Sequence, residues 1–415
     1  MKTFFTISLL FFSLFAEADS WMQKANFGGG KRQATFSFSI EAKGYVGTGD
    51  DSLSKTVKSF WEYDPSLNSW TQKADFPGIP FAYGVGFSIS NYGYAGLGVD
   101  TSPNALNDFW EYDPSTNTWT AKANFPSVVM YITFAPVSFS IGNFGYVCTN
   151  GDSTYNSELW QYDPSLDIWT RKNNLAGVYR AEATGFSIGS KGYVGTGYGN
   201  NLLNDFWEYD PSINSWTQKA NMPGNERCDA AGFSICNKGY IAVGEGPVDS
   251  FLNDIWEYDA IANQWTQKTN FPGANRDEVA CFVIGDKAYI GTGGADLHTL
   301  TQFKDFYEYT PDSNSCFTTG INEHSSSAFQ FQVSPNPAHE ELVVGLTPNP
   351  SLKERGVGAT IEIYNVFGEK VYGAQLQTSN SKLQTVIDIR DFSEGIYFIV
   401  ATDGEEKAVR KFVKE

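Results

Sequence analysis

Histidine is scarce in this sequence, which has three histidines among 415 residues: His298, His324 and His339. A copper or zinc site built on histidine, or an acid–base pair that uses it, needs at least two imidazoles in one place. Only His298 falls in the repetitive part of the chain. The scarcity therefore disfavours histidine-based chemistry there, and we expect no metal and no cofactor.

Cysteine and basic residues are also under-represented. The five cysteines form no C-x-x-C pair, so the sequence contains neither a zinc knuckle nor an evident disulfide framework, and we expect most of them to be buried or free. Basic residues number 29 against 47 acidic ones, and the net charge is −18. Because nucleic acids and anionic lipids select basic surfaces, we expect neither as a partner.

Long apolar runs are confined to the first 18 residues. Lys2, the apolar residues 4–15 and the A-x-A sequence at residues 16–18 form the pattern of a cleaved signal peptide. The apolar run is shorter than the ~20 residues that a membrane-spanning helix needs. We therefore expect export, a mature chain that begins at Asp19, and no transmembrane helix.

Tryptophan, in contrast, recurs on a fixed period. Six tryptophans lie 47 to 50 positions apart: Trp21, Trp70, Trp119, Trp169, Trp216 and Trp265. Each of the last five is preceded by another tryptophan nine positions earlier: Trp61, Trp110, Trp160, Trp207 and Trp256. A period near fifty in a sequence of short strands predicts a radial β array, in which each unit packs on its neighbours.

Each repeat reads as four strands. F-S-I (residues 38–40 in the first repeat) is short and apolar, as expected of an innermost strand, and K-G-Y-V-G-T-G follows as the second, with glycines that permit close packing. D-F-W-E-Y-D and W-T-Q-K predict the third and fourth strands, which the turn D-P-S-x-N joins as a hairpin. The repeats predict an all-β propeller of six blades. The unpaired Trp21 would supply the outer strand of the last blade and so close the ring.

These motifs resemble kelch repeats across residues 19–317, through the G-T-G sequence, the third-strand tyrosine and the spaced tryptophans. The sequence departs from the usual kelch pattern because only Gly293 and Gly294 form a glycine doublet. Kelch propellers include copper oxidases, sugar mutarotases and binding modules, so the fold leaves the function open. The copper of the galactose oxidase type is held by two histidines and two tyrosines, and the repeats lack the second histidine.

The end of the chain has a different composition. After a polar linker at residues 318–328, alternating runs in residues 329–415 predict a small immunoglobulin-like β-sandwich. This part resembles the C-terminal sorting domain of the type IX secretion system, with an insertion at residues 347–358. The resemblance implies that the type IX machinery exports the protein to the medium or to the outer cell surface. The sorting-signal residues are Pro335, Asn336, Pro337, Gly395, Tyr397, Lys411, Phe412, Val413 and Lys414.

Four arginines occupy one position of the repeat, six residues before the innermost-strand phenylalanine: Arg32, Arg180, Arg227 and Arg276. We expect them at the mouth of the central channel, opposite Phe81, Tyr83 and Thr133, where they could bind the carboxylate or sulfate of a sugar while the aromatic residues stack on its ring. The alternative is that these arginines are structural and bridge blades through backbone carbonyls. The nearby acids could accept hydrogen bonds or act as acid or base: Glu182, Glu226, Asp229, Asp277 and Glu278.

Two readings of the function remain open at this stage. The first is a non-catalytic module that binds a glycan or a protein, through the arginines or through the variable loops after the second strand. The second is a carbohydrate-active enzyme of the sugar-acid mutarotase type, which would use the arginines and a carboxylate. An acid before the third-strand aromatic recurs in five repeats, which favours a structural role for it: Asp108, Glu158, Asp205, Asp254 and Asp305.

Overall fold

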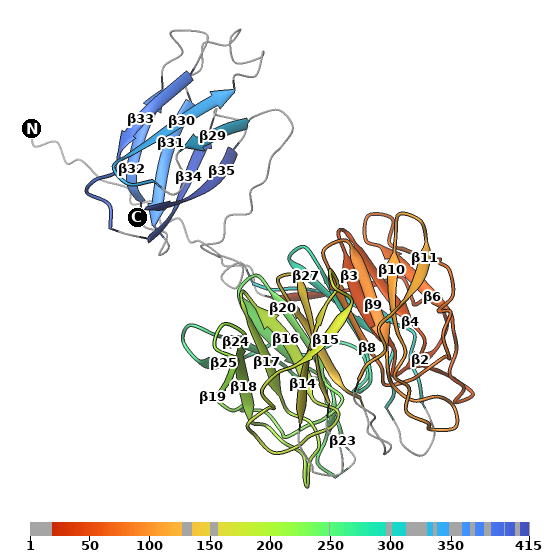
Figure 1. The fold of residues 1–415 in the computed structure, drawn as a ribbon. Coiled ribbons are helices and arrows are strands. Elements are labelled where there is room, and N and C mark those ends of the chain that lie inside the picture. Colours follow the sequence, from red (N-terminus) through yellow and green to blue (C-terminus); the bar gives the residue numbers. More distant parts are fainter. Residues whose placement is uncertain are drawn as a thin grey trace, which may run out of the picture. The chain divides into compact units, whose positions relative to one another are not determined.

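The computed structural model describes residues 19–126, 135–149, 157–248, 250–295, 301–312, 330–334, 338–347, 359–365, 370–376, 383–393, 395–402 and 407–414. Every regular element in these ranges is a strand (Figure 1). No helix in the described part of the chain is long and apolar enough to cross a membrane. The chain divides into two compact units, Met1–Cys316 and Phe317–Glu415.

The described part of the first unit contains six four-stranded antiparallel sheets, numbered here as blades 1 to 6. Blades 1 to 3 are β3 (Phe36–Ile40), β4 (Lys43–Gly47), β6 (Phe60–Asp64) and β7 (Ser69–Gln72); β8 (Val85–Ile89), β9 (Tyr92–Gly96), β10 (Phe109–Asp113) and β11 (Thr118–Lys122); and β12 (Val137–Ile141), β13 (Phe144–Thr149), β14 (Glu158–Asp163) and β15 (Ile168–Arg171). Blades 4 to 6 are β16 (Thr184–Ile188), β17 (Lys191–Gly195), β18 (Phe206–Asp210) and β19 (Ser215–Lys219); β20 (Ala231–Ile235), β21 (Lys238–Ala242), β24 (Ile255–Asp259) and β25 (Gln264–Lys268); and β26 (Ala280–Ile284), β27 (Lys287–Gly291), β28 (Phe306–Thr310) and β1 (Ser20–Lys24).

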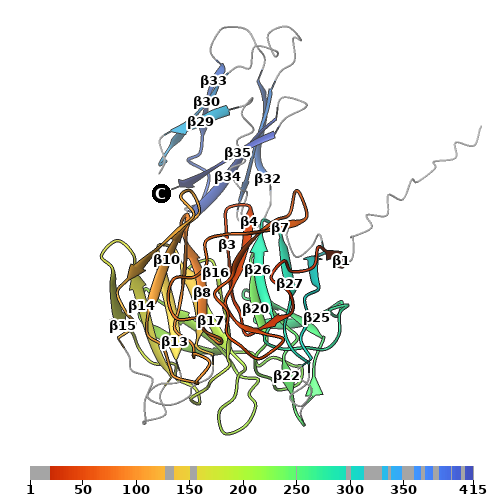
Figure 2. The same cartoon turned by 90° about the vertical axis from the view of Figure 1, so that its right-hand side faces the viewer.

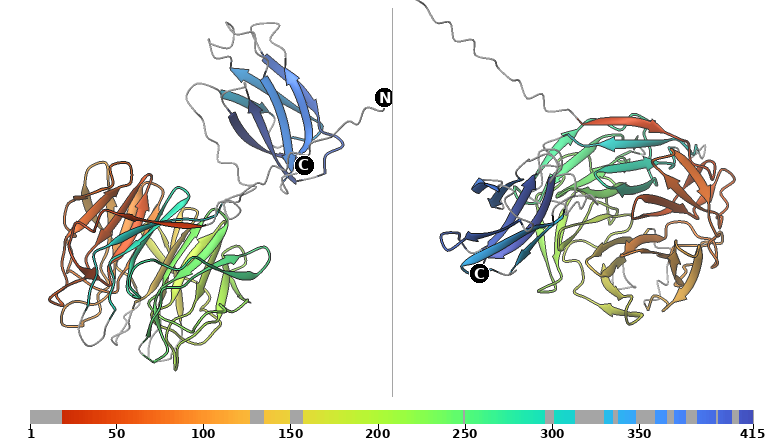
Figure 3. Two further views of the ribbon diagram at one scale, coloured as in Figure 1. Left: turned by 180° about the vertical axis from the view of Figure 1, so that it is seen from behind. Right: turned by 90° about the horizontal axis from the view of Figure 1, so that it is seen from above.

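The innermost strands form a closed ring. Each of β3, β8, β12, β16, β20 and β26 contacts the next, and β26 contacts β3 again. Figure 2 shows innermost strands in the middle of this unit, with the outer strands β15 and β25 at its periphery. The N-terminal β1 pairs with β28 from Ser20↔Thr310 to Lys24↔Phe306, and the two lie side by side, red beside teal, in the view from above (Figure 3). The predicted closure through Trp21 is therefore confirmed.

The tryptophan period follows from contacts between blades. Each fourth-strand indole N–H donates to a backbone carbonyl in the segment that joins the preceding blade's outer strand to the innermost strand of its own blade, for example Trp70 to Ala25 at 3.2 Å. Trp21 closes the ring in the same way, by donating to the carbonyl of Thr269 at 2.8 Å. Because one such bond is needed at each junction between blades, the tryptophans recur once per repeat.

The glycines of the second strand make room for the neighbouring blade. A Cβ atom on Gly93 would lie 2.2 Å from the ring of Phe38, which belongs to the innermost strand of the preceding blade. The strand also ends earlier than the G-T-G pattern predicts, at Gly47 in blade 1, because Thr48 and Gly49 both take positive φ angles of 53° and 79°. The chain turns there towards the ring axis.

The second unit contains two facing sheets. One is β29 (Gln330–Ser334), β30 (Glu341–Thr347) and β33 (Leu383–Asp388), and the other is β32 (Lys370–Leu376), β31 (Ala359–Asn365), β34 (Gly395–Thr402) and β35 (Lys407–Lys414). Leu342 and Ile387 from the first sheet share one buried core with Ile361 and Ile399 from the second. The predicted β-sandwich agrees with this arrangement.

The sorting-signal residues of this unit fall partly outside the described residues. Tyr397 and Phe412 are register partners on β34 and β35, and their rings stack at 5.4 Å in the core. Gly395 opens β34 and Lys414 ends β35, while Lys411 and Val413 are described only as strand positions. Pro335, Asn336 and Pro337, with most of the insertion at residues 347–358, lie outside the described residues.

Candidate functional site

The four arginines that the sequence singles out lie inside their blades. Their side chains are almost completely buried, with 3% of Arg32 and Arg180 and none of Arg227 and Arg276 exposed. Arg227 forms two hydrogen bonds of 2.8 Å to the carboxylate of Asp254 and another of 2.9 Å to the carbonyl of Val243. Arg180 and Arg276 bind Asp205 and Asp305 in the same way.

This geometry corrects the expectation that the arginines line a channel mouth. The guanidinium donors of Arg180, Arg227 and Arg276 are taken up by the acid before the third-strand aromatic and by carbonyls of the same blade, and those of Arg32 bond the Ser59 hydroxyl and backbone carbonyls. This is a structural role. Phe81, at the equivalent position of blade 2, is fully buried and packs on Phe36 and Phe76. Thr133 lies outside the described residues. Four of the five recurrent acids also accept from the third-strand tryptophan of their blade, as Asp254 does from Trp256, which fits the structural role expected of this position.

A different residue of each blade lies at the ring axis, two positions after the arginine or after the residue that replaces the arginine in blades 2 and 3. In all six blades this residue has a positive φ angle, between 41° and 57°. The six residues, called here the axial ring, are Ala34, Tyr83, Ala135, Glu182, Asp229 and Glu278. Backbone N–H groups of five of them donate to the carbonyl of the member in the preceding blade, as Glu278 does to Asp229 at 3.2 Å and Ala34 does to Glu278 at 3.1 Å.

Carboxylates gather on one side of the axial ring. Glu182, Asp229 and Glu278 are consecutive members of it, and Glu245 and Asp277 stand next to them on blades 5 and 6. Asp277 is buried, whereas the other four are half-buried. The geometry thus brings together four of the five acids named from the sequence and adds Glu245, while the fifth, Glu226, is exposed.

Burial and mutual repulsion raise the pKa of four of these carboxyl groups, those of Glu182, Asp229, Asp277 and Glu278. Burial, followed by the charges of Glu182 and Glu278, raises the pKa of Asp229 well above its ordinary value. Burial and the neighbouring Glu278 raise the pKa of Asp277 to about 9, and burial raises the pKa of Glu278 to about 7. Groups that change charge near neutral pH are typical of binding and catalytic sites.

Hydrogen-bonding groups surround the carboxylates. The hydroxyl of Tyr83 donates to Glu278 Oε1 at 2.7 Å, while Oε2 of the same carboxylate is buried without a protein partner. Gln302 is 2% exposed, and neither its amide nitrogen nor its oxygen has a partner in the part of the chain that the structure describes. Gly294 pairs with Asp277 on one side and Gln302 on the other, so the Gln302 and Asp277 side chains lie on the same face of this ladder.

Two sets of ligand atoms at the axial ring are close enough to hold a cation. The atoms of Glu182, Cys228 and Asp229, and those of Asp229, Glu245 and Asp277, lie within 4.8 Å of one another. Carboxylate and amide oxygens suit a hard cation such as Ca²⁺. Cys228 is a buried thiol, and burial and the adjacent acids raise its pKa, which disfavours the thiolate that would bind a metal. The groups at this site that can bind a cation or exchange a proton are therefore the carboxyl groups.

The sequence singled out four of these acids but grouped them with the arginines, which the structure places inside the blades. Glu182, Asp229 and Glu278 share a repeat position two residues after the arginine, and in an extended strand this spacing would place both side chains on the same face. The positive φ angle, which turns the second residue towards the axis, leaves no clear mark in the sequence because Ala, Tyr, Glu and Asp all occur there.

Comparison with known proteins agrees with both units. Models of the kelch motif and of the secretion system C-terminal sorting domain match residues 192–223 and 332–415, respectively. The solved structure of YjhT is similar to this chain, with a TM-score of 0.58, 17% identity, and coverage of 68% of this chain and 95% of that one. No protein among those with curated descriptions matches this sequence.

These matches fix the class of the protein and its route out of the cell. At 17% identity the likeness to YjhT concerns the fold alone. The sorting domain indicates export through the type IX secretion system, to the cell surface or into the medium. The first unit is thus a β-propeller that contains a kelch motif, and the second carries a secretion system C-terminal sorting domain.

Proposed function

We propose that the exported propeller is a non-catalytic binding module whose axial ring takes the hydroxyl groups of a neutral glycan. The observation that carries this proposal is the meeting of Glu182, Asp229 and Glu278 on one side of the ring, opposite Tyr83. Carboxyl groups accept hydrogen bonds and, in the protonated form that burial favours at this site, also donate one. Sugar hydroxyls are neutral groups that both donate and accept, so they fit such partners.

The placement of charge determines which glycans fit. The guanidinium groups that would attract a sugar acid are buried and paired within their blades. The groups that remain at the axial ring are acidic. Burial and then mutual repulsion raise the pKa of Asp229 and Asp277, and an anionic ligand would add to that repulsion. A neutral ligand meets no such cost.

A glycan-binding experiment on the mature chain from Asp19 tests the proposal. Neutral and acidic oligosaccharides of matched length are immobilised, and retention of the wild type is compared with that of Asp229→Asn and of Asp113→Asn, a control in the β10–β11 turn. We expect retention on neutral glycans, a loss of about tenfold or more in Asp229→Asn, and wild-type behaviour in the control. Preference for acidic glycans, or equal binding by all three proteins, would contradict the proposal.

A carbohydrate-active enzyme of the mutarotase type is the second candidate. It is favoured by one observation: Glu278, with its pKa raised to about 7, accepts a 2.7 Å hydrogen bond from Tyr83. A carboxyl group with a pKa near 7 suits general acid–base catalysis at neutral pH. Anomer interconversion of neutral sugars followed by polarimetry, with a loss in Glu278→Gln, would support this function over simple binding.

A further inference from the structure

Blade 2 contains an acid without the arginine that accompanies its counterparts. Asp108 occupies the position of Asp205, Asp254 and Asp305, but Phe81 stands where blades 4 to 6 have arginine. Asp108 Oδ2 accepts from Trp110 Nε1 at 3.0 Å, whereas Oδ1 is buried and has no hydrogen-bond partner among the described residues. In blade 3, where threonine replaces the arginine, Glu158 instead pairs with Arg171 at 2.8 Å.

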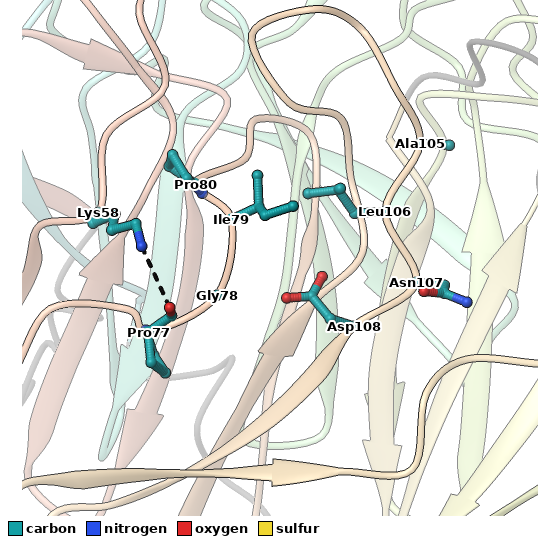
Figure 4. Close-up of a pocket in the computed structure, with 9 residues that line it drawn as sticks. All are labelled: Lys58, Pro77, Gly78, Ile79, Pro80, Ala105, Leu106, Asn107 and Asp108. Atoms are coloured by element: carbon teal, nitrogen blue, oxygen red, sulfur yellow. Dashed lines mark hydrogen bonds between the residues drawn. The ribbon is translucent and has the colours of Figure 1, made fainter.

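An open pocket of about 500 Å³ lies beside this carboxylate. Figure 4 shows the Asp108 side chain pointing into it from one wall, opposite Lys58 and Ile79 on the other. The volume is in the usual range for small-molecule and side-chain sites. The Lys58 ammonium donates to the Pro77 carbonyl at 3.3 Å, and within the described residues no ion pair joins Lys58 to Asp108.

The sibling blades show which group fits beside such an acid. In blades 5 and 6 the guanidinium forms two bonds to the carboxylate, and its Nε donates to the carbonyl two residues earlier, that of Asn225 or Ala274. The carbonyl at the same place in blade 2 is that of Ile79, which lines the pocket. Phe81 cannot supply a donor because it is apolar and packed into the core.

We propose that this pocket binds the guanidinium group of an arginine side chain presented by a protein partner. Asp108 accepts it as Asp205, Asp254 and Asp305 accept their own arginines, since a planar guanidinium matches a carboxylate with two parallel bonds. The exposed Ile79, with 53% of its surface accessible, and the adjacent Pro77 and Pro80 form an apolar rim for the partner's backbone. The site is separate from the axial ring and does not depend on glycan binding.

A titration with minimal ligands tests the proposal on the full mature chain. The probes are N-acetyl-arginine amide and N-acetyl-citrulline amide, which has the same shape without the charge. The indole N–H signal of Trp110, which is bonded to Asp108, reports binding in protein labelled with ¹⁵N-tryptophan. We expect the arginine probe to shift this signal. The citrulline probe should bind at least about tenfold more weakly than the arginine probe.

Three variants distinguish this site from general attraction to an acidic protein. Asp108→Asn keeps the acceptor for Trp110 but should weaken the arginine probe by about tenfold or more, and Phe81→Arg should abolish binding by filling the site from within. Asp75 is an exposed carboxylate two residues before Pro77 of the pocket, and Asp75→Asn should leave binding unchanged. If Asp108→Asn does not fold, Phe81→Arg decides. An unmoved Trp110 signal, equal binding of both probes, or binding that survives in Phe81→Arg would overturn the proposal.

Discussion

Blade 1 has the buried arginine but lacks the acid that blade 2 retains, and a single substitution that supplies this acid should stabilise it. Arg32 is buried, but Ser59 stands where blades 4 to 6 have aspartate, so the guanidinium reaches only hydroxyl and carbonyl oxygens. Two donors remain without a partner, Arg32 Nε and Trp61 Nε1. Burial lowers the pKa of Arg32 to about 10. We predict that Ser59→Asp raises the free energy of unfolding.

The magnitude follows from what the new carboxylate would replace. The buried guanidinium has already lost its hydration in the wild type, so the substitution adds only the desolvation of the acid. A charge-assisted hydrogen bond contributes about 1.5–3 kcal/mol and a satisfied indole N–H about 1 kcal/mol, from which part of the acid's desolvation must be subtracted. A net gain of about 2 kcal/mol remains, equivalent to ~4 °C in the midpoint of thermal unfolding for a domain of this size.

Urea and thermal unfolding of wild type, Ser59→Asp and Ser59→Asn measure this gain. The asparagine variant supplies an acceptor for Trp61 without the charge and should gain less than half as much. In blades 4 and 5 burial alone would raise the pKa of Asp205 and Asp254, but the bonds from Arg180 and Arg227 hold it below the ordinary value. The gain in Ser59→Asp should therefore be present at pH 7 and disappear below the ordinary pKa of an aspartate, near 4. An equal gain in both variants, or one independent of pH, would refute the reasoning.

Three other outcomes can be checked on the same protein. Because the folded state holds protons on Asp277 and Glu278 that the unfolded chain has lost above pH ~5, stability should fall as pH rises towards 9, and urea midpoints should fall less in Asp277→Asn. Arg227→Ala should cost about 3 kcal/mol in unfolding experiments, since it leaves the half-buried Asp254 without its ionic partner. Asp19→Ala should lower the thermal midpoint by removing the acceptor for Thr269 at the ring closure.

The fold could be predicted from the sequence because each blade repeats the same strands, turns and contacts with its neighbour. The spacing of nine between two tryptophans is the length of a hairpin, and the spacing near fifty is the distance from one junction to the next, as in Trp70 and Trp119. The unpaired Trp21 marked the closure. The end of the second strand was harder to place, since Thr48 and Gly49 continue the strand-like composition while their backbone turns away.

The candidate site was less accessible because it depends on side-chain direction at single positions. A guanidinium and a carboxylate two residues apart, such as Arg227 and Asp229, would share a face if the segment were an extended strand. The positive φ angle of Asp229 breaks that alternation and sends one side chain into the blade and the other to the axis. Glu245 was missed for a different reason, since it lies in the segment after the second strand, which differs among the repeats and forms the short strand β22 (Glu245–Gly246) in blade 5.

The exceptions to the repeat carry the functional information that the repeat itself cannot. Where arginine and acid both occur, as in blades 4 to 6, the pair satisfies itself and serves the fold. Where one partner is missing, a buried charge remains: Arg32 in blade 1 is covered by neutral oxygens, while Asp108 in blade 2 faces a pocket. A buried carboxylate oxygen without a donor is costly in a folded protein unless something binds it. The two blades therefore differ in kind: the first can be improved from within by one aspartate, whereas the second is open to a ligand from outside.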